Sequence, residues 1–144
     1  MPTRDLAQRG RTDRSAPGTT PGIDEIAALF DHWNAALQTG DAQIVAALYA
    51  PDAVLVPTVS NKVRRTRAEI EDYFRHFLIK KPRGRIVESN IRIYDDIAID
   101  SGRYDFTLTI DGVELDLPCR YSFVYRKLGR DWRIVEHHSS VMPE

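Results

Sequence analysis

The sequence predicts an α+β domain in which helices near the N-terminus cover one face of a curved antiparallel sheet. Between residues 23 and 78, apolar side chains recur every three or four positions, which is typical of amphipathic helices. From Gly84 onward the apolar period becomes two, which is typical of strands with one buried face. Short turns, Asp111-Gly112 among them, separate these strands and favour tight hairpins. These observations predict helices first and an antiparallel meander after them.

Three helices are predicted, and each has a start or a stop signal in the sequence. They span residues 23–39, 41–50 and 66–78. Gly40 separates the first two, because it can adopt the left-handed conformation that ends a helix. Thr66 is the expected N-cap of the third, since its hydroxyl can accept a hydrogen bond from the first turn.

Strands are predicted in the second half of the chain, after one short β-rich run at residues 53–57. The four longer strands are expected at Arg85–Tyr94, Ile97–Ile110, Val113–Lys127 and Asp131–Ser139. Short turns connect them, so consecutive strands should pair with each other. The helices need a surface on which to bury their apolar stripes, and this meander provides it.

The composition indicates one globular domain. The 144 residues are 42% hydrophobic and 28% charged, and a formal net charge of −1 provides no field that would hold nucleic acid or an anionic membrane. No apolar run is long enough to span a bilayer. The single cysteine, Cys119, cannot form an internal disulfide, which favours a reduced cytoplasmic setting. No Cys/His spacing resembles a metal site, so neither a metal nor another cofactor is expected.

Residues 1–22 are expected to form a disordered tail, and residues 23–144 a single domain. The tail mixes four arginines with prolines and glycines, and it has few apolar side chains that could offset the entropy of ordering. It also lacks the apolar middle region of a secretory signal.

The two longest predicted strands have faces of opposite character, because alternate side chains point to opposite sides of a sheet. One face is aromatic and consists of Tyr104, Phe106, Leu108, Ile110, Tyr121, Phe123 and Tyr125. The other is polar and consists of Arg103, Asp105, Thr107, Thr109, Arg120, Ser122 and Val124. In one interpretation the aromatic face lies under the helices and the polar face in water. In the other, the polar face lines a pocket that contains both arginines, and the aromatic face packs against another subunit.

Two adjacent histidines, His137 and His138, lie near the end of the last predicted strand. Neighbouring residues of a strand point to opposite faces, so only one of the two can enter a pocket. There it could act as a donor, an acceptor or a proton shuttle, or it could be a hydrogen-bonded structural group.

Several stretches of the sequence carry a resemblance to a known family. They are GDAQIVAALYAPDAVLVPT, DYFRHFL, RYDFTLTIDG, CRYSFVYR and DWRIVEHHSSVMP. Residues 23–144 resemble the nuclear transport factor 2-like superfamily and, within it, the SgcJ/EcaC group, which is close to the SnoaL-like cyclases and the calcium/calmodulin-dependent kinase II association domain. The resemblance implies a cone-shaped, cystatin-like domain whose helices and sheet enclose a cavity, usually dimeric through the outer sheet face. It therefore favours the second interpretation of the faces.

The resemblance also implies residues that bind a ligand. An arginine that receives carboxylates in the kinase association domain corresponds to Arg103, and Arg120 lies on the same predicted face. Two further cavity arginines of that domain correspond to Ser122 and Ser139, so its complete anion site is absent here. The expected ligand-binding residues are Arg103, Arg120, Tyr49, Trp33, Asp105 and Ser122.

Ketosteroid isomerases share this fold, but the sequence departs from their catalytic pattern. Pro57 lies near the position of the aspartate base, and Trp33 lies where a tyrosine donor would be. Any catalysis would therefore depend on His137 or His138, together with the two arginines.

The resemblance implies two alternative functions. SgcJ-like proteins accompany enediyne polyketide pathways and SnoaL-like proteins cyclise polyketides, which implies a small-molecule-binding accessory protein of secondary metabolism. Its expected ligand is polyketide-like or carboxylate-bearing, its expected state is a homodimer, and whether it catalyses a reaction is left open. The alternative is a non-enzymatic oligomerisation module that resembles the kinase association domain.

Overall fold

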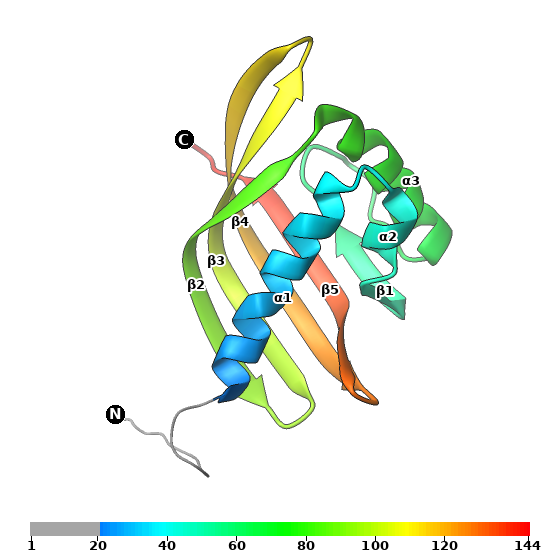
Figure 1. Cartoon of the computed structure of the whole chain (residues 1–144), viewed down its shortest axis with the longest axis vertical. Helices are drawn as coiled ribbons and strands as arrows, with labels where there is room; N and C mark the ends of the chain where they lie inside the picture. The colour runs from blue at the N-terminus through cyan, green and yellow to red at the C-terminus, as the bar shows by residue number, and fades with distance from the viewer. Residues whose placement is uncertain (1–20) are drawn as a thin grey trace.

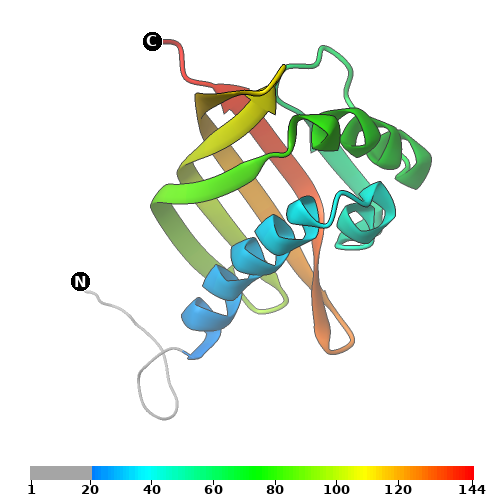
Figure 2. The ribbon, with the colours of Figure 1, turned by 45° about the horizontal axis from the view of Figure 1, so that its top comes forward.

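The computed structural model describes residues 21–144, and the predicted tail, except for its last residues, lies outside that range. Helices lie on one face of a curved sheet, and α1 crosses that face diagonally (Figures 1 and 2). The elements are α1 (Pro21–Gln38), α2 (Ala42–Ala46), β1 (Tyr49–Val56), α3 (Arg67–Phe77), the short 3-10 helix η2 (Leu78–Lys80), β2 (Arg83–Tyr94), β3 (Ile97–Ile110), β4 (Val113–Leu128) and β5 (Asp131–Val141). The predicted α+β class is confirmed.

The predicted N-cap of the third helix, Thr66, is present in the structure, and Asp41, which was not named as a cap from the sequence, caps α2 in the same way. The Asp41 side chain accepts a hydrogen bond from the backbone N–H of Gln43, and the Thr66 hydroxyl accepts one from Glu69. The second helix is shorter than predicted and ends at Ala46. Tyr49 instead begins β1, where it pairs with β5, so sheet pairing overrides the helical pattern at this position.

The sheet is mixed rather than wholly antiparallel. Its strand order is β1-β5-β4-β3-β2, and the four long strands form the predicted antiparallel meander. Strand β1 joins this meander beside β5 and runs parallel to it. The first and the last strands of the chain are therefore neighbours, and the residues of β1 lie next to those of β5.

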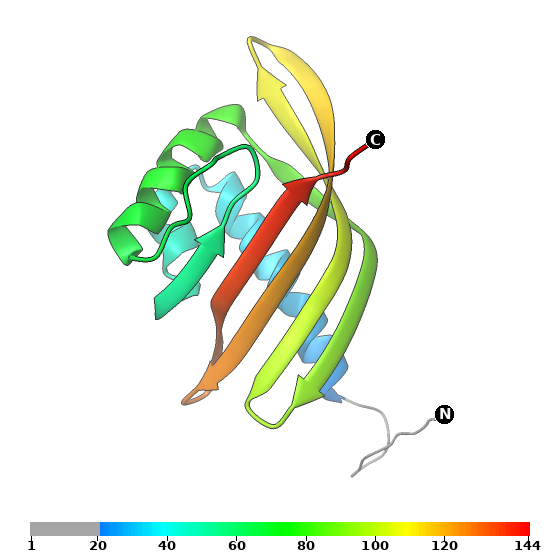
Figure 3. The same ribbon diagram turned by 180° about the vertical axis from the view of Figure 1, so that it is seen from behind.

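The aromatic face of the sheet lies under the helices, which confirms the first interpretation and shows that the second is wrong. Tyr104 and Phe123 are fully buried, and the ring of Trp33 on α1 stacks on Tyr104 with centroids 6.2 Å apart. Aromatic rings bury more apolar area than any other side chains, so their removal from water stabilises this arrangement. Within residues 21–144, no helix lies on the opposite face of the sheet (Figure 3).

A bulge in β5 changes which of its residues point inward. Tyr125 of β4 pairs with Ile134, but the next residue, Val124, pairs with Glu136, so Val135 is an extra residue in β5. After this bulge His137 points toward the helices and is buried, whereas its neighbour His138 is exposed on the outer face.

Candidate functional site

A chain of hydrogen bonds crosses the interior between α1 and the sheet. Nε1 of Trp33 donates to the hydroxyl of Tyr49 at 3.2 Å. That hydroxyl lies 2.8 Å from Nδ1 of His137, and Nε2 of the same imidazole lies 3.1 Å from the hydroxyl of Tyr104. All these side chains are buried, and they come from α1, β1, β5 and β3. The fold therefore brings four distant segments to one polar cluster.

The donors and acceptors in this series of hydrogen bonds fix the tautomer of His137. The Tyr49 hydroxyl already accepts from Trp33, so its hydrogen would be unpaired unless it donated to Nδ1 of His137. Nε2 of His137 then carries the hydrogen and donates to the oxygen of Tyr104. The hydroxyl hydrogen of Tyr104 is left available to a further acceptor.

Burial keeps the side chains of this hydrogen-bonded cluster uncharged at neutral pH. Desolvation, with a smaller contribution from His138, lowers the pKa of His137 from 6.5 to about 3. Desolvation also raises the pKa of Tyr49 and of Tyr104 well above the ordinary value of a phenol. His137 packs face to face on Phe123, with ring centroids 4.0 Å apart, so its ring is held in place as well as neutral.

A small cavity lies next to Tyr104, where this series of hydrogen bonds ends. Its volume is about 10 Å³, which is about the room that one water molecule needs. It is lined by Trp33, Leu55, Pro57, Thr58, Tyr73, Phe74, Phe77, Tyr104, Phe106, His137 and Ser139. Oγ of Ser139 and Oγ1 of Thr58 are both buried and make no hydrogen bond of ordinary geometry within the part of the chain that the structure describes, although Ser139 lies near the Tyr104 hydroxyl and both lie near the Cys119 thiol. The surface of the cavity itself is therefore apolar, and these hydroxyl groups lie directly behind it.

A larger surface depression lies outside this cavity. It has a volume of about 440 Å³ and is formed by the β1–α3 loop and the end of β5. Pro57, Thr58 and Ser139 line both spaces, so they form the partition between the surface and the interior. In the same loop Val59 has a φ of 49°, a left-handed conformation that is costly for a β-branched residue. The loop that contributes Pro57 and Thr58 to this partition is thus a strained segment.

The cluster is better suited to donating hydrogen bonds than to abstracting a proton. Both nitrogens of His137 already have hydrogen-bond partners, and its low pKa makes it a weak base. The Tyr104 and Ser139 hydroxyls can donate to a carbonyl oxygen placed between them. Among residues 21–144, no group of three or more His, Cys, Asp or Glu side chains could hold a metal ion.

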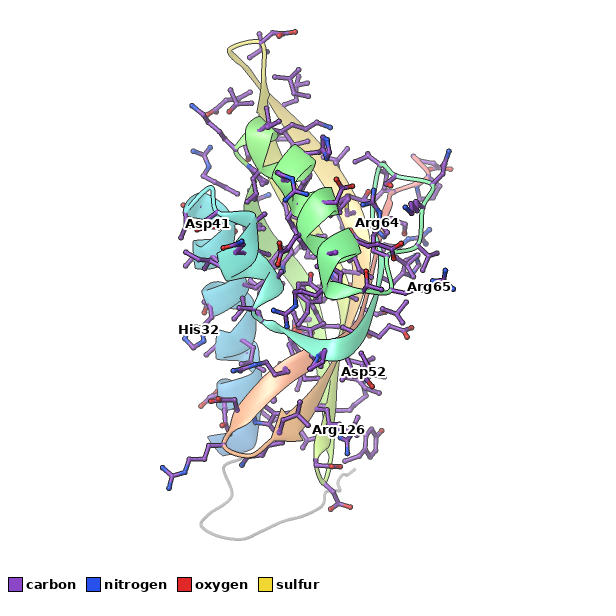
Figure 4. The ribbon with its side chains drawn as sticks, turned by 90° about the vertical axis from the view of Figure 1, so that its right-hand side faces the viewer. His32, Asp41, Asp52, Arg64, Arg65 and Arg126 are labelled. Atoms are coloured by element: carbon purple, nitrogen blue, oxygen red, sulfur yellow. The ribbon has the colours of Figure 1, made fainter. Side chains whose placement is uncertain are left out.

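The polar residues predicted for the pocket lie instead on the outer face of the sheet. Arg103 is half-exposed, and its guanidinium lies 3.9 Å from Asp105, which also pairs with Arg85 at 2.9 Å. Arg103 pairs across strands with Arg120, which is exposed. The expectation that the arginines lie inside the cone is therefore wrong, because the aromatic residues occupy the interior face. Figure 4 shows other charged side chains, such as Arg126, at the periphery as well.

Of the predicted site residues, the interior cluster contains Trp33, Tyr49 and His137. Ser122 and His138 lie on the outer face with Arg103, Asp105 and Arg120, since Ser122 pairs with His138 across β4 and β5. Thr58, Tyr104 and Ser139 also lie at the interior cavity and were not predicted as ligand-binding residues from the sequence. Tyr104 was visible as part of the aromatic face, whereas nothing in the sequence singles out Thr58.

A curved sheet covered by helices on one face is the cystatin-like, NTF2-like fold. Within that class, residues 22–143 match the family model of the calcium/calmodulin dependent protein kinase II association domain. The chain belongs to this family. No curated protein matches it.

Solved structures agree with this assignment. A protein from Xanthomonas campestris, described as an association domain of the same kind, is 52% identical, with a TM-score of 0.85 over 94% of this chain and 99% of that one. A proposed dehydratase of the NTF2-like family from Streptomyces avermitilis is 13% identical, with a TM-score of 0.75 over 85% of this chain and 97% of that one. A ketosteroid isomerase-like protein from Erwinia carotovora atroseptica is 17% identical, with a TM-score of 0.71 over 88% and 100%. The last two show the fold alone. None of the described helices is both long and apolar enough to cross a membrane.

Proposed function

We propose that this domain binds a small uncharged molecule whose carbonyl oxygen enters the interior cavity. The observation that carries the proposal is the buried series of hydrogen bonds that links Trp33, Tyr49, His137 and Tyr104. This series ends beside the unpaired hydroxyls of Ser139 and Thr58. A buried polar group without a partner is costly, at about 1–3 kcal/mol, so a bound acceptor would stabilise these donors. The body of the ligand would occupy the outer depression and its oxygen the interior.

An uncharged ligand fits this cavity better than a carboxylate. The residues that line it include no lysine or arginine, and His137 is neutral. A carboxylate buried there would have no cation to compensate its charge. Of the two expected ligand classes, the polyketide-like, carbonyl-bearing one is therefore supported by the cavity, and the carboxylate-bearing one is not.

The proposal extends to the biological setting. Membership of the SgcJ/EcaC group would place the protein in secondary metabolism, with enediyne-type polyketide biosynthesis as the specific expectation. The supporting observations are the terminal sequence DWRIVEHHSSVMP and a pocket of suitable chemistry. The buried, single Cys119 supports a reduced cytoplasmic setting. Binding without catalysis is the form we favour, because neither ring nitrogen of His137 is free to act as a base.

Thermal unfolding with two matched probes tests this function. The ketone 2-octanone should raise the melting temperature in proportion to the logarithm of its concentration above Kd, whereas octanoate should not. Tyr104→Phe and Ser139→Ala should each weaken the response by about tenfold in concentration, since each removes one hydrogen-bond donor. Arg126→Gln, an exposed residue that lines neither the cavity nor the outer depression, is the control and should respond like the wild type. An equal response to octanoate, or an unchanged response in both interior variants, would contradict the proposal.

A second candidate function is self-association through the outer face of the sheet. The aromatic interface expected from the sequence, which included Tyr104 and Phe106, is wrong because those rings form the core. On the uncovered face, however, Ile99 and Val124 are neighbours across β3 and β4 and are only half-buried. We propose that this apolar centre, surrounded by charged side chains, forms a homodimer interface. Val124→Asp should then convert dimers to monomers in sedimentation, and a wild type that sediments as a monomer would refute the interface.

A further inference from the structure

A second groove lies between α1 and the β4–β5 hairpin. Its volume is about 270 Å³, and it is lined by Glu25, Ala28, Leu29, His32, Trp33, Leu48, Tyr125, Arg130, Asp131, Trp132, Arg133 and Ile134. Trp33 is the one described residue that lines both this groove and the interior cavity. Figure 4 shows α1, which carries His32, next to the β4–β5 hairpin. The groove is therefore a separate space with its own set of polar groups.

Two polar atoms of the groove residues are buried without a hydrogen-bond partner in the described part of the chain. One is the hydroxyl oxygen of Tyr125, a residue that is only 2% exposed, and the other is Nε1 of Trp132. The core structure does not use either group, since Tyr125 packs on Phe123 through its ring alone. Burial raises the pKa of Tyr125, so its hydroxyl keeps its hydrogen at neutral pH. Both donors therefore lie just behind the groove wall, in side chains that line it, and the Trp132 group can only donate.

The walls of the groove are aromatic and aliphatic, and its charges cancel. Glu25 and Asp131 contribute two negative charges, and Arg130 and Arg133 contribute two positive ones. Asp131 and Arg133 pair with each other at 3.3 Å. Neither an anion nor a cation is therefore favoured over a neutral molecule. The volume lies near the lower end of the range of about 300–1,000 Å³ for ligand sites, which limits the occupant to about two fused rings.

We propose that this groove is a second binding site, for a flat, uncharged aromatic molecule that carries a hydroxyl or carbonyl oxygen. The ring system lies against Trp33, Trp132 and the aliphatic side chains. A small rotation of the two lining side chains brings their donors to the groove, where the ligand oxygen accepts a hydrogen bond from Nε1 of Trp132 and bonds to the hydroxyl of Tyr125. This site is independent of the carbonyl site in the interior cavity, because the two use different donors.

Nuclear magnetic resonance tests the proposal directly, since the chain has two tryptophans and each gives one indole N–H signal. On titration with 2-naphthol, the Trp132 indole signal should move downfield because its hydrogen becomes bonded, and Trp132→Phe identifies that signal. Naphthalene has the same ring system without the oxygen. It should bind about tenfold more weakly and leave the Trp132 hydrogen unbonded.

The matched variants separate this site from the interior one. Tyr125→Phe should weaken 2-naphthol about tenfold, leave naphthalene unchanged, and maintain or raise the melting temperature, because it removes an unpaired buried hydroxyl. Tyr104→Phe should not alter 2-naphthol binding, whereas it should weaken 2-octanone. Equal affinities for 2-naphthol and naphthalene, or a full response in Tyr125→Phe, would overturn the proposal. A Trp132 signal that depends on protein concentration and not on 2-naphthol would also overturn it, since a second copy of the chain would then cover the groove.

Discussion

The neutral state of His137 makes the stability of the fold depend on pH. Its pKa is about 3 in the folded protein and about 6.5 in the unfolded chain, because burial disfavours the charged imidazole. The unfolded state therefore binds a proton below pH 6.5 that the folded state does not bind, and stability falls as the pH falls through that value. From pH 7 to pH 5 the loss works out at about 2 kcal/mol, and it stops growing near pH 3. For a domain of this size, that loss corresponds to a decrease in melting temperature on the order of 6 °C.

Urea unfolding at pH 7 and pH 5 measures this effect, with His137→Gln as the variant that cannot titrate. We expect the wild type to lose about 2 kcal/mol more than His137→Gln over this interval. His32→Gln is the matched control, because His32 is exposed on α1 and does not contribute to the shifted pKa of His137, and it should behave like the wild type. If His137→Gln does not fold, the imidazole carbon shifts of the wild type supply the same information and should show a neutral ring at pH 5. A wild type and His137→Gln with equal pH dependence, or a ring that protonates near pH 6.5, would refute the reasoning.

Three further predictions concern the structure around the site. Gly102→Ala places a Cβ against the backbone carbonyl oxygen of Glu88, which cannot move aside easily, so circular dichroism should show a melting temperature lower by more than about 5 °C. Tyr49→Phe removes the donor to Nδ1 of His137, so nitrogen resonances should show a mixture of imidazole tautomers and urea unfolding a loss of about 1 kcal/mol. Arg64→Ala breaks an ion pair and a backbone hydrogen bond to α3, so the melting temperature should fall by about 3 °C.

The class of fold could be predicted from the sequence because the change from a helical to a strand period is local information. The same alternation also separated the two faces of β3 and β4 correctly. It could not decide which face the helices cover, since alternation defines two sets of residues without assigning either to the interior. The greater apolar area of Tyr104, Phe106 and Phe123 decides that question in the structure. The family resemblance pointed the other way, because it placed Arg103 in the cavity.

The interior site was less accessible to prediction, for two physical reasons. The bulge at Val135 shifts the alternation within β5, so strict counting from Trp132 would place Glu136 and His138 inward. In addition, the parallel pairing of β1 with β5 brings Tyr49 to His137 across 88 residues of sequence, and no local pattern signals such a contact. A histidine near the chain end was therefore recognisable as a candidate, but its partners were not.

The position of β1 beside β5 has a consequence for how the protein folds during synthesis. The helices and β1 leave the ribosome early, yet the strand that completes their side of the sheet is the last to be made. The backbone of Tyr49 can pair within the sheet only after Ile134, its partner in the parallel ladder, has been synthesised. Contacts between such distant segments slow folding, because the long intervening loop must close first. We therefore expect nascent chains that stop before β5 to remain open and to depend on chaperones, and the synthesis of β5 to allow the final closure.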